Sequence, residues 1–226
     1  MNAFQSNRRR PLWVAMVQSM VRWFFRLLFT MFYRVRVHGL ENYPDNEVKP
    51  ENDRLLVCSN HQSFLDPIVL GVVCPRPVNY LARKTLYRFK PLAVFLNFND
   101  SIPIDLESTG LAGVKETLRR LKRNEAVVMF PEGTRSRDGE MQPLMPGFCL
   151  LAKRSKATLM PVGLSGCFDA YPPQALIPRP GVIHAVLGSP IPFEEYGHLS
   201  DEETTALLAA RINECFTEAK RRSGKT

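Results

Sequence analysis

A short polar block, Asn60 to Asp66, contains the residue types needed to move a proton. His61 can accept a proton from a hydroxyl near neutral pH. Asp66, five residues later, can hold the second ring nitrogen and stabilise the imidazolium. On one helix the two side chains would lie on different faces, so this role requires a turn that folds Asp66 back. The structural alternative makes Asp66 a helix cap and His61 an ordinary polar residue.

A second block, Phe130 to Ser136, has the composition of a phosphate-binding turn. Gly133 permits a tight turn, and Arg135 offers a planar fork that fits a phosphate. Glu132 can orient that arginine or accept a hydrogen bond from a substrate hydroxyl. The alternative is a surface turn with an ordinary charged pair.

Both blocks directly follow short apolar runs, where open α/β sheets place their sites. The alternating patterns predict an α/β fold, a mostly parallel sheet flanked by helices. Strands are predicted at 34–38, 55–59, 78–82, 101–104, 126–130, 158–164 and 182–187. Helices are predicted at 67–73 with Asp66 as cap, 85–98 with a break at Pro91, 109–123, 146–156, and after a capping box at Ser200 and Glu203. A proline-rich loop covers 171–180.

The N-terminal segment, residues 1–33, differs from the rest. Three arginines at 8–10 precede an apolar, aromatic-rich run with helical spacing. Arg22 and Arg26 argue against a spanning helix, and no cleavage site supports a signal peptide, twin-arginine or otherwise. A core helix remains an alternative. The pattern favours an interfacial, membrane-anchoring helix, followed by one catalytic domain at 34–226.

Composition narrows the partners without choosing one. The net charge of +8 suits nucleic acid, an anionic bilayer or a phosphorylated substrate. The aromatic residues concentrate in the N-terminal run, which favours lipid over nucleic acid. The five cysteines form no CxxC pair and the four histidines are scattered, so no zinc site or disulfide framework is indicated. No Walker loop or dinucleotide fingerprint occurs.

Together the two blocks resemble the lysophosphatidic acid acyltransferases, PlsC-like members of the glycerolipid acyltransferase superfamily. The first block has the pattern Asn-His-x4-Asp, and the second contains Glu-Gly-Thr-Arg in full. Further similarity is found at Arg83-Lys84-x-Leu86, Pro91, Ile102 to Asp105, and Met160-Pro161-Val162. The resemblance spans residues 35–192.

The resemblance implies transfer of a fatty acyl group from acyl-CoA or acyl carrier protein to a lysophospholipid hydroxyl. The expected acceptor is 1-acylglycerol-3-phosphate, giving phosphatidic acid. His61 would be the general base and Asp66 its orienting partner. Acceptor binding is expected at Lys84, Glu132, Gly133, Thr134 and Arg135. The implied setting is the cytoplasmic face of a membrane, where the protein would be peripheral or monotopic, with a lipid surface as partner and no metal, redox cofactor or nucleic acid.

Two positions depart from the family pattern. Leu106 and Met145 stand where the family usually has basic residues. Acyl transfer is therefore better supported than any one head group, and a different lipid acceptor stays open. So does a non-catalytic, basic membrane-binding protein. A hydrolase would need a Gly-x-Ser-x-Gly elbow, which 163–166 does not provide, and Ser63 is better placed to hydrogen-bond the loop than to act as a nucleophile.

Overall fold

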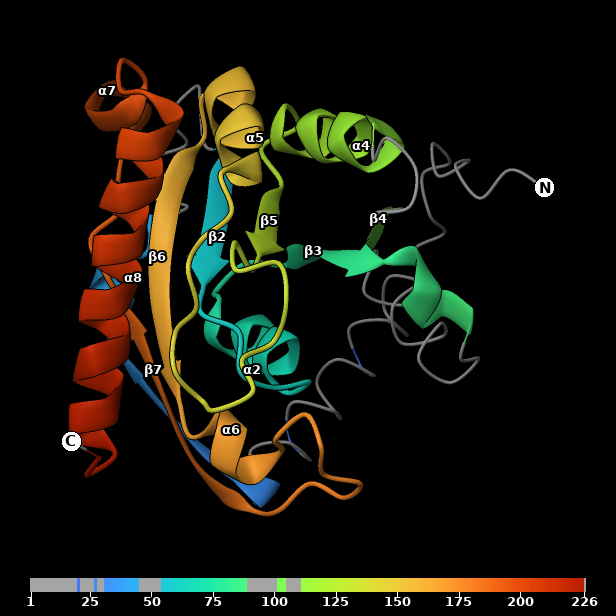
Figure 1. Cartoon of the computed structure of the whole chain (residues 1–226), viewed down its shortest axis with the longest axis vertical. Helices are drawn as coiled ribbons and strands as arrows, with labels where there is room; N and C mark the ends of the chain where they lie inside the picture. The colour runs from blue at the N-terminus through green and yellow to red at the C-terminus, as the bar shows by residue number, and fades with distance from the viewer. Residues whose placement is uncertain are drawn as a thin grey trace.

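The protein is built around a seven-stranded sheet with the order β1-β7-β6-β2-β5-β3-β4. The computed structural model describes residues 20, 27, 31–44, 54–88, 101–104 and 111–225. Strands β6, β2, β5, β3 and β4 are parallel to one another. Strands β7 and β1 run parallel to each other and antiparallel to the rest, through the β6–β7 pairing. The predicted α/β fold with a mostly parallel sheet is confirmed (Figure 1).

The elements follow the apolar patterns closely. The strands are β1 (Tyr33–His38), β2 (Leu55–Ser59), β3 (Val78–Arg83), β4 (Ile102–Ile104), β5 (Ala126–Met129), β6 (Thr158–Ser165) and β7 (Gly181–Leu187). The α-helices are α2 (Asp66–Val73), α4 (Leu111–Leu121), α5 (Gly147–Ser155), α6 (Cys167–Ala170), α7 (Phe193–Tyr196) and α8 (Asp201–Arg222). Two 3-10 helices are η1 (Leu40–Asn42) and η2 (Lys84–Arg88).

The central strand β2 is buried on both faces, as expected for a strand inside a parallel sheet. Leu55 and Val57 belong to a core that also contains Val69 and Leu70 of α2. The intervening residue Leu56 belongs to a second core, with Phe148 of α5 and Leu208 and Ile212 of α8. Alternate residues of β2 therefore pack into two different cores. The end of this strand, which leads to His61, is held from both sides.

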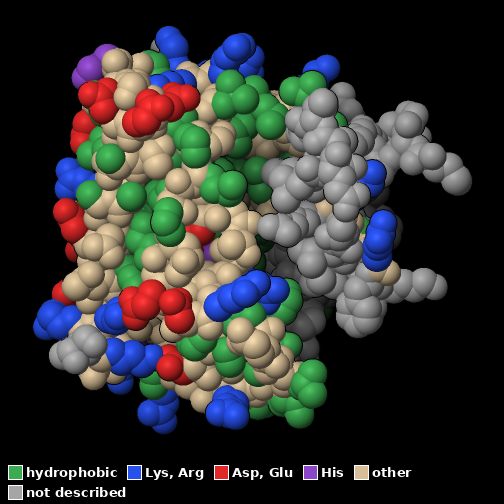
Figure 2. Space-filling model, viewed as in Figure 1, with side chains coloured by type: hydrophobic (Ala, Val, Ile, Leu, Met, Phe, Trp, Pro, Cys, Tyr) green, Lys and Arg blue, Asp and Glu red, His purple; other side chains and the backbone are tan. Residues whose placement is uncertain are grey.

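Helix α8 lies along β6 and ends beside the end of that strand (Figure 1). Its start is fixed by the predicted capping box, in which Ser200 and Glu203 exchange hydrogen bonds with each other's backbone. Its last turn reaches Ser165, the final residue of β6, through the hydroxyl of Ser223 at 3.2 Å. We call the side of the sheet at which β2, β5 and β6 end the carboxyl edge. Lys and Arg side chains are spread over the lower part of Figure 2, where α8 ends.

Several local predictions need correction. Asp66 is not the cap of α2 but its first residue; Leu65 occupies the cap position, and no side chain caps the helix. The helix predicted at 85–98 is described only to Arg88, as the 3-10 helix η2. The short helices α6 and α7 were not predicted, because four residues are too few to show a periodic pattern.

The N-terminal prediction lies almost wholly outside the described residues. Of residues 1–33, the structure describes Met20, Leu27 and the stretch 31–33, and Tyr33 is already part of β1. Within the described part of the chain, no helix is both long enough and apolar enough to cross a membrane. The interfacial helix and the domain boundary at residue 33 stay predictions.

Gly163 in β6 provides a test of the packing of α8. A Cβ atom at this position would overlap the backbone of Cys215 and Phe216, so only glycine allows the helix to lie this close. We expect Gly163→Ala to lower the free energy of unfolding by about 1–3 kcal/mol or more, as overpacked sites do. Urea unfolding measures the change.

Gly147, at the start of α5, is the matched control, because a Cβ there meets no atom within 4 Å. Gly147→Ala should leave the free energy of unfolding unchanged or slightly raised. Equal stability of the two variants would contradict the close approach of α8 to β6.

Candidate active site

The turn that holds His61 is clamped to the sheet by Asn60. The Asn60 side chain donates to the Leu164 carbonyl at 3.0 Å and accepts from the Leu164 backbone N–H at 2.8 Å. This buried amide continues the β2–β6 pairing by one residue after β2 has ended. The start of the turn that bears His61 is therefore fixed relative to β6.

The carboxylate of Asp66 organises the remainder of that turn. Its Oδ2 atom accepts from the Nδ1 atom of His61 at 2.7 Å and from the backbone N–H groups of Gln62 and Ser63 at 2.6 and 2.7 Å. The side chain is wholly buried. It also faces the buried thiol of Cys167, whose pKa is raised by burial and by the charge of Asp66. Asp66 folds back onto His61 as the strand-to-helix turn was expected to allow.

The His61 ring is held on its face as well as at its edge. It stacks on the ring of Phe130, with centroids 4.0 Å apart and planes 16° from parallel. Its side chain is 17% exposed, whereas that of Asp66 is 0% exposed. Because Asp66 occupies Nδ1, Nε2 is the ring nitrogen left to exchange a proton with a substrate. Phe130 was not singled out from the sequence beyond its place in the second block.

Glu132 connects the second block to the first. Its Oε1 accepts from the backbone N–H of His61 at 2.8 Å, and its Oε2 accepts from the N–H of Gln142 at 3.1 Å. The His61 carbonyl in turn accepts from the N–H of Ser136 at 2.7 Å. The backbone N–H and the backbone carbonyl of His61 are thus both hydrogen-bonded to the second turn. This positioning role was missed, because its partners are 71 residues apart in the chain.

The pKa of Glu132 is raised from 4.5 to about 7. Burial is the main cause, since the residue is only 4% exposed. The two backbone donors oppose the shift, while the charges of Asp66 and Asp138 add to it. The hydrogen bonds that hold His61 therefore depend on a carboxyl group that changes charge near neutral pH.

The second turn places Arg135 beside the turn that bears His61, where it contacts Phe64. Gly133 has φ 72°, a left-handed conformation that favours glycine, and its N–H donates to the Phe130 carbonyl at 3.0 Å. The guanidinium carbon of Arg135 lies 3.6 Å from the centroid of the exposed Phe64 ring. This stacking fixes the plane of the guanidinium fork. Thr134 is exposed on the same turn.

Lys84 comes from a neighbouring strand. It begins η2 directly after β3, which pairs in parallel with β5 and therefore ends at the same edge of the sheet. Its side chain is exposed. All seven predicted site residues thus follow β2, β5 or β3 at the carboxyl edge: His61, Asp66, Lys84, Glu132, Gly133, Thr134 and Arg135.

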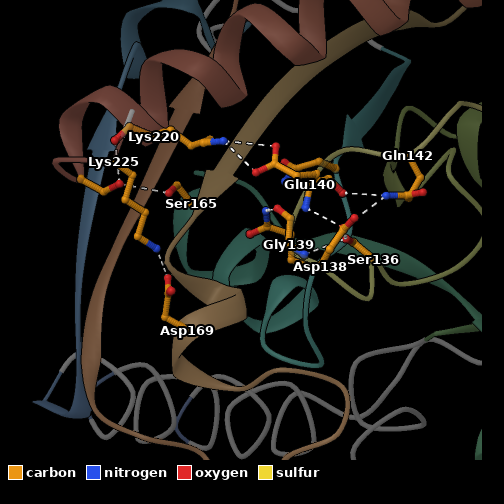
Figure 3. A network of polar contacts seen from close by, with 12 residues as sticks. Ser136, Asp138, Gly139, Glu140, Gln142, Ser165, Asp169, Lys220 and Lys225 are labelled. Atoms are coloured by element: carbon orange, nitrogen blue, oxygen red, sulfur yellow. Dashed lines mark hydrogen bonds and ion pairs between the residues drawn. The ribbon is translucent and has the colours of Figure 1, made fainter.

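The loop after the second turn is tied to the end of α8 (Figure 3). Ser136 donates to Asp138 at 2.7 Å and accepts from the N–H of Gly139 at 2.9 Å, which closes a small turn. Glu140 forms an ion pair with Lys220 at 2.8 Å. Within the same loop, the Gly139 carbonyl accepts from the buried side chain of Gln62. The two turns and the last turn of α8 therefore form one connected unit.

Other chemistries find less support. Ser63 donates to the Tyr171 carbonyl at 2.6 Å and accepts from the Leu65 N–H, which is the loop-bonding role expected for it. In the described part of the chain, no three His, Cys, Asp or Glu side chains converge as a metal site requires. The five cysteines are all buried and unpaired with one another.

A buried carboxylate that orients a partly exposed histidine at the end of a sheet is an arrangement suited to acid–base chemistry. Sequence comparison agrees with this class. The sequence model of the acyltransferase family matches residues 34–165. The chain belongs to that family and is an acyltransferase, and the predicted resemblance to lysophosphatidic acid acyltransferases is confirmed.

Individual relatives extend the match beyond the central region. The 1-acyl-sn-glycerol-3-phosphate acyltransferase of Bacillus subtilis is 28% identical over 185 residues, which cover 81% of this chain and 87% of that protein. The human 1-acyl-sn-glycerol-3-phosphate acyltransferase beta is 28% identical over 156 residues, 68% of this chain but 54% of its own length.

A solved structure shares the fold. The crystal structure of the LPA acyltransferase PlsC from Thermotoga maritima superimposes with a TM-score of 0.77, over 94% of this chain and 83% of that chain. At 23% sequence identity, this likeness establishes the arrangement of the sheet and helices.

Replacing Glu132 tests whether the second turn positions the base. In Glu132→Gln, an amide NH2 would face one of the two backbone N–H groups, and the His61 turn would shift. Because small misplacements of catalytic groups are costly, we expect kcat to fall by about 10- to 100-fold while the protein stays folded. Glu194→Gln, on an exposed residue of α7, is the control and should retain full activity.

The raised pKa of Glu132 leads to a second, independent prediction. Between pH 4.5 and about 7 the folded protein binds a proton at Glu132 that the unfolded chain does not. The free energy of unfolding should therefore decrease as the pH rises through this window, and Glu132→Gln should remove that part of the decrease. Urea unfolding at several pH values measures it; an unchanged pH profile together with unchanged kcat would contradict the assigned role.

Proposed function

We propose that this acyltransferase moves a fatty acyl group from an acyl thioester to the free hydroxyl of 1-acylglycerol-3-phosphate, giving phosphatidic acid. Either acyl-CoA or an acyl carrier protein would serve as donor, and no step is assigned to a cofactor. The observation that supports the reaction most strongly is the buried Asp66 carboxylate on Nδ1 of His61. The names of the relatives supply the substrate class.

His61 acts as the general base in this proposal. Nε2 takes the proton of the acceptor hydroxyl as the oxygen attacks the thioester carbonyl. Asp66 stabilises the imidazolium that forms, in the manner of the aspartate in hydrolase triads. When the tetrahedral intermediate collapses, the C–S bond breaks, and the proton held by His61 goes to the departing thiolate. The enzyme carries no covalent intermediate, which fits the hydrogen-bonding role found for Ser63.

The acceptor phosphate is assigned to the second turn and its neighbour. Arg135 supplies a planar fork whose orientation is set by Phe64. Gly133 and Thr134 present an exposed, tightly turned backbone beside it. Lys84 adds a cation from the next strand along the sheet. Glu132 contributes by holding the second turn against His61, because both of its carboxyl oxygens accept hydrogen bonds from backbone N–H groups.

One observation favours a second candidate acceptor. Met145 is 61% exposed, and its sulfur lies 2.6 Å from the point that a Cβ of Gly133 would occupy. A thioether thus borders the phosphate-binding turn where the family usually has a cation. An acceptor with a less charged head group is the alternative. A panel of lysolipids that share one acyl chain but differ in head group would separate the two, with kcat/KM as the readout.

The cellular setting follows from the substrates. Both the acceptor and the product are membrane lipids, so we place the enzyme at the cytoplasmic face of a membrane, as a peripheral or monotopic protein. The basic composition of the chain suits an anionic lipid surface. The apolar N-terminal segment remains the predicted anchor.

Loss of the base should abolish the reaction. We expect His61→Ala to lower kcat by about 100- to 10,000-fold, the usual contribution of general-base catalysis. Asp66→Asn should have a comparable effect, because an amide cannot stabilise the imidazolium. His198→Ala is the control, since His198 is exposed near α7, away from the carboxyl edge. A decrease of less than tenfold for His61→Ala would exclude this mechanism.

The role of Arg135 is tested by a substitution that keeps its charge. Arg135→Lys removes both the bidentate fork and the flat surface that stacks on Phe64. We expect the KM for the acceptor to rise by about tenfold, the equivalent of 1–2 kcal/mol, with little change in the KM for the donor. Arg137→Lys, two residues further on and exposed, should leave both constants unchanged. Equal effects of Arg135→Lys on both substrates would assign the residue to the donor or to the fold.

A further inference from the structure

The loop that joins α6 to β7 exposes two adjacent aliphatic side chains at its tip. In this loop, residues 171–180, Leu176 is 94% exposed and Ile177 is 76% exposed. Single exposed apolar residues are common on protein surfaces. Here two exposed apolar residues are adjacent, at the tip of the loop. Four prolines, at 172, 173, 178 and 180, stiffen this loop, so the two side chains form a rigid apolar projection.

The loop is anchored at its base and to the catalytic turn. The Arg179 N–H donates to the Ala170 carbonyl at 2.7 Å and closes the loop. At the other end, the Tyr171 carbonyl accepts from the hydroxyl of Ser63 at 2.6 Å, and the Tyr171 ring lies 5.9 Å from that of Phe64. The apolar tip therefore has a fixed position relative to the turn that holds His61.

Other exposed apolar residues lie at the same edge of the sheet. Because β7 and β1 run against the other strands, both begin at the carboxyl edge, where Gly181 pairs with Tyr33. Met31 and Phe32, directly before β1, are 76% and 56% exposed. The loop after α6 extends to the lower right in Figure 1, and hydrophobic side chains gather at that place in Figure 2.

Basic residues surround these apolar side chains. Arg179 is exposed next to the loop tip, and Arg34 is exposed on β1, paired in register with Val182. The end of α8 adds Arg221, Arg222 and Lys225 at the same edge, partly balanced by Glu218 and Asp169. Apolar tips flanked by arginine and lysine suit the interface of an anionic bilayer, where apolar side chains enter the acyl region and cations meet the phosphates.

We propose that residues 171–180 form a membrane-docking loop, with Leu176 and Ile177 inserted into the interface of an anionic lipid bilayer. Docking in this orientation brings the turn of His61 and Arg135 to the lipid surface. The proposal rests on the proposed function in one respect, since it explains how the catalytic turn meets a lipid acceptor. It does not require the N-terminal segment.

The burial of all five native cysteines allows a direct test. Leu176→Cys in the full-length chain can be labelled with an environment-sensitive fluorophore. On vesicles of phosphatidylcholine with phosphatidylglycerol, we expect a blue shift of its emission and quenching by lipids that carry a quencher in the acyl chain. Leu40→Cys is the matched control: it is 47% exposed in η1, at the opposite end of β1, and should show neither effect.

The outcomes decide the proposal. An unshifted and unquenched label at position 176 overturns it, whether or not the protein binds the vesicles. An equal response on pure phosphatidylcholine overturns the part assigned to the basic residues. A label response that depends on protein concentration without vesicles would indicate a second copy of the chain as the occupant, and would overturn it as well.

An activity measurement separates this inference from the proposed function. Leu176→Ser/Ile177→Ser should lower the rate on vesicle-embedded acceptor by about tenfold or more, because each aliphatic side chain contributes at least that much to partitioning when buried. The rate on a short-chain, water-soluble acceptor should not change, and Leu40→Ser should change neither rate. Equal rates for the double variant and the natural chain on vesicles contradict the docking loop. If the natural chain transfers no acyl group to either acceptor, the proposed function fails, and the fluorescence result still decides on docking.

Discussion

The arrangement of the active site depends on one buried oxygen atom, Oδ2 of Asp66. A carboxylate without access to water must be compensated by hydrogen bonds, and here three N–H groups supply them: two from the backbone of the turn and one from His61. The same bonds that compensate the charge also determine the path of the chain from 61 to 66. The orientation of the His61 ring and the local fold are therefore one constraint, and neither can change without the other.

This constraint extends into the second turn, residues 130–136, through the backbone of His61. Its N–H donates to Glu132 and its carbonyl accepts from Ser136, so the backbone of His61 is held on both sides of its Cα atom. Phe130, at the start of the same turn, supports the ring. The loop that follows is tied to α8 by Glu140 and Lys220. The turn proposed to bind phosphate thus also fixes the backbone of His61, which lies 71 residues earlier in the chain than Glu132.

The sequence predicted the parts of the fold whose signals are local. The apolar runs of β2 and β5, and the capping box of α8 at Ser200, lie where the patterns placed them. The residues predicted for the site also follow strand ends, and the structure places them at one edge of the sheet. What the sequence did not reveal depends on contacts between distant segments. The bond from His61 N–H to Glu132 leaves no periodic pattern, and Asp66 resembles a cap because acids are common at helix starts, although its carboxylate points backward.

The direction of β1 and β7 has a consequence for how the enzyme meets its substrates. In a sheet with all strands parallel, β1 would begin at the edge opposite the active site. Because both strands are reversed, β1 begins at the carboxyl edge, and the chain before Tyr33 enters the domain there. The loop before Gly181 is at that edge for the same reason. Strand reversal thus gathers the catalytic turn, the 171–180 loop and the entry of the N-terminal segment on one side. If residues 171–180 dock on a bilayer as proposed, the turn of His61 and the start of β1 lie on the side of the domain that faces it.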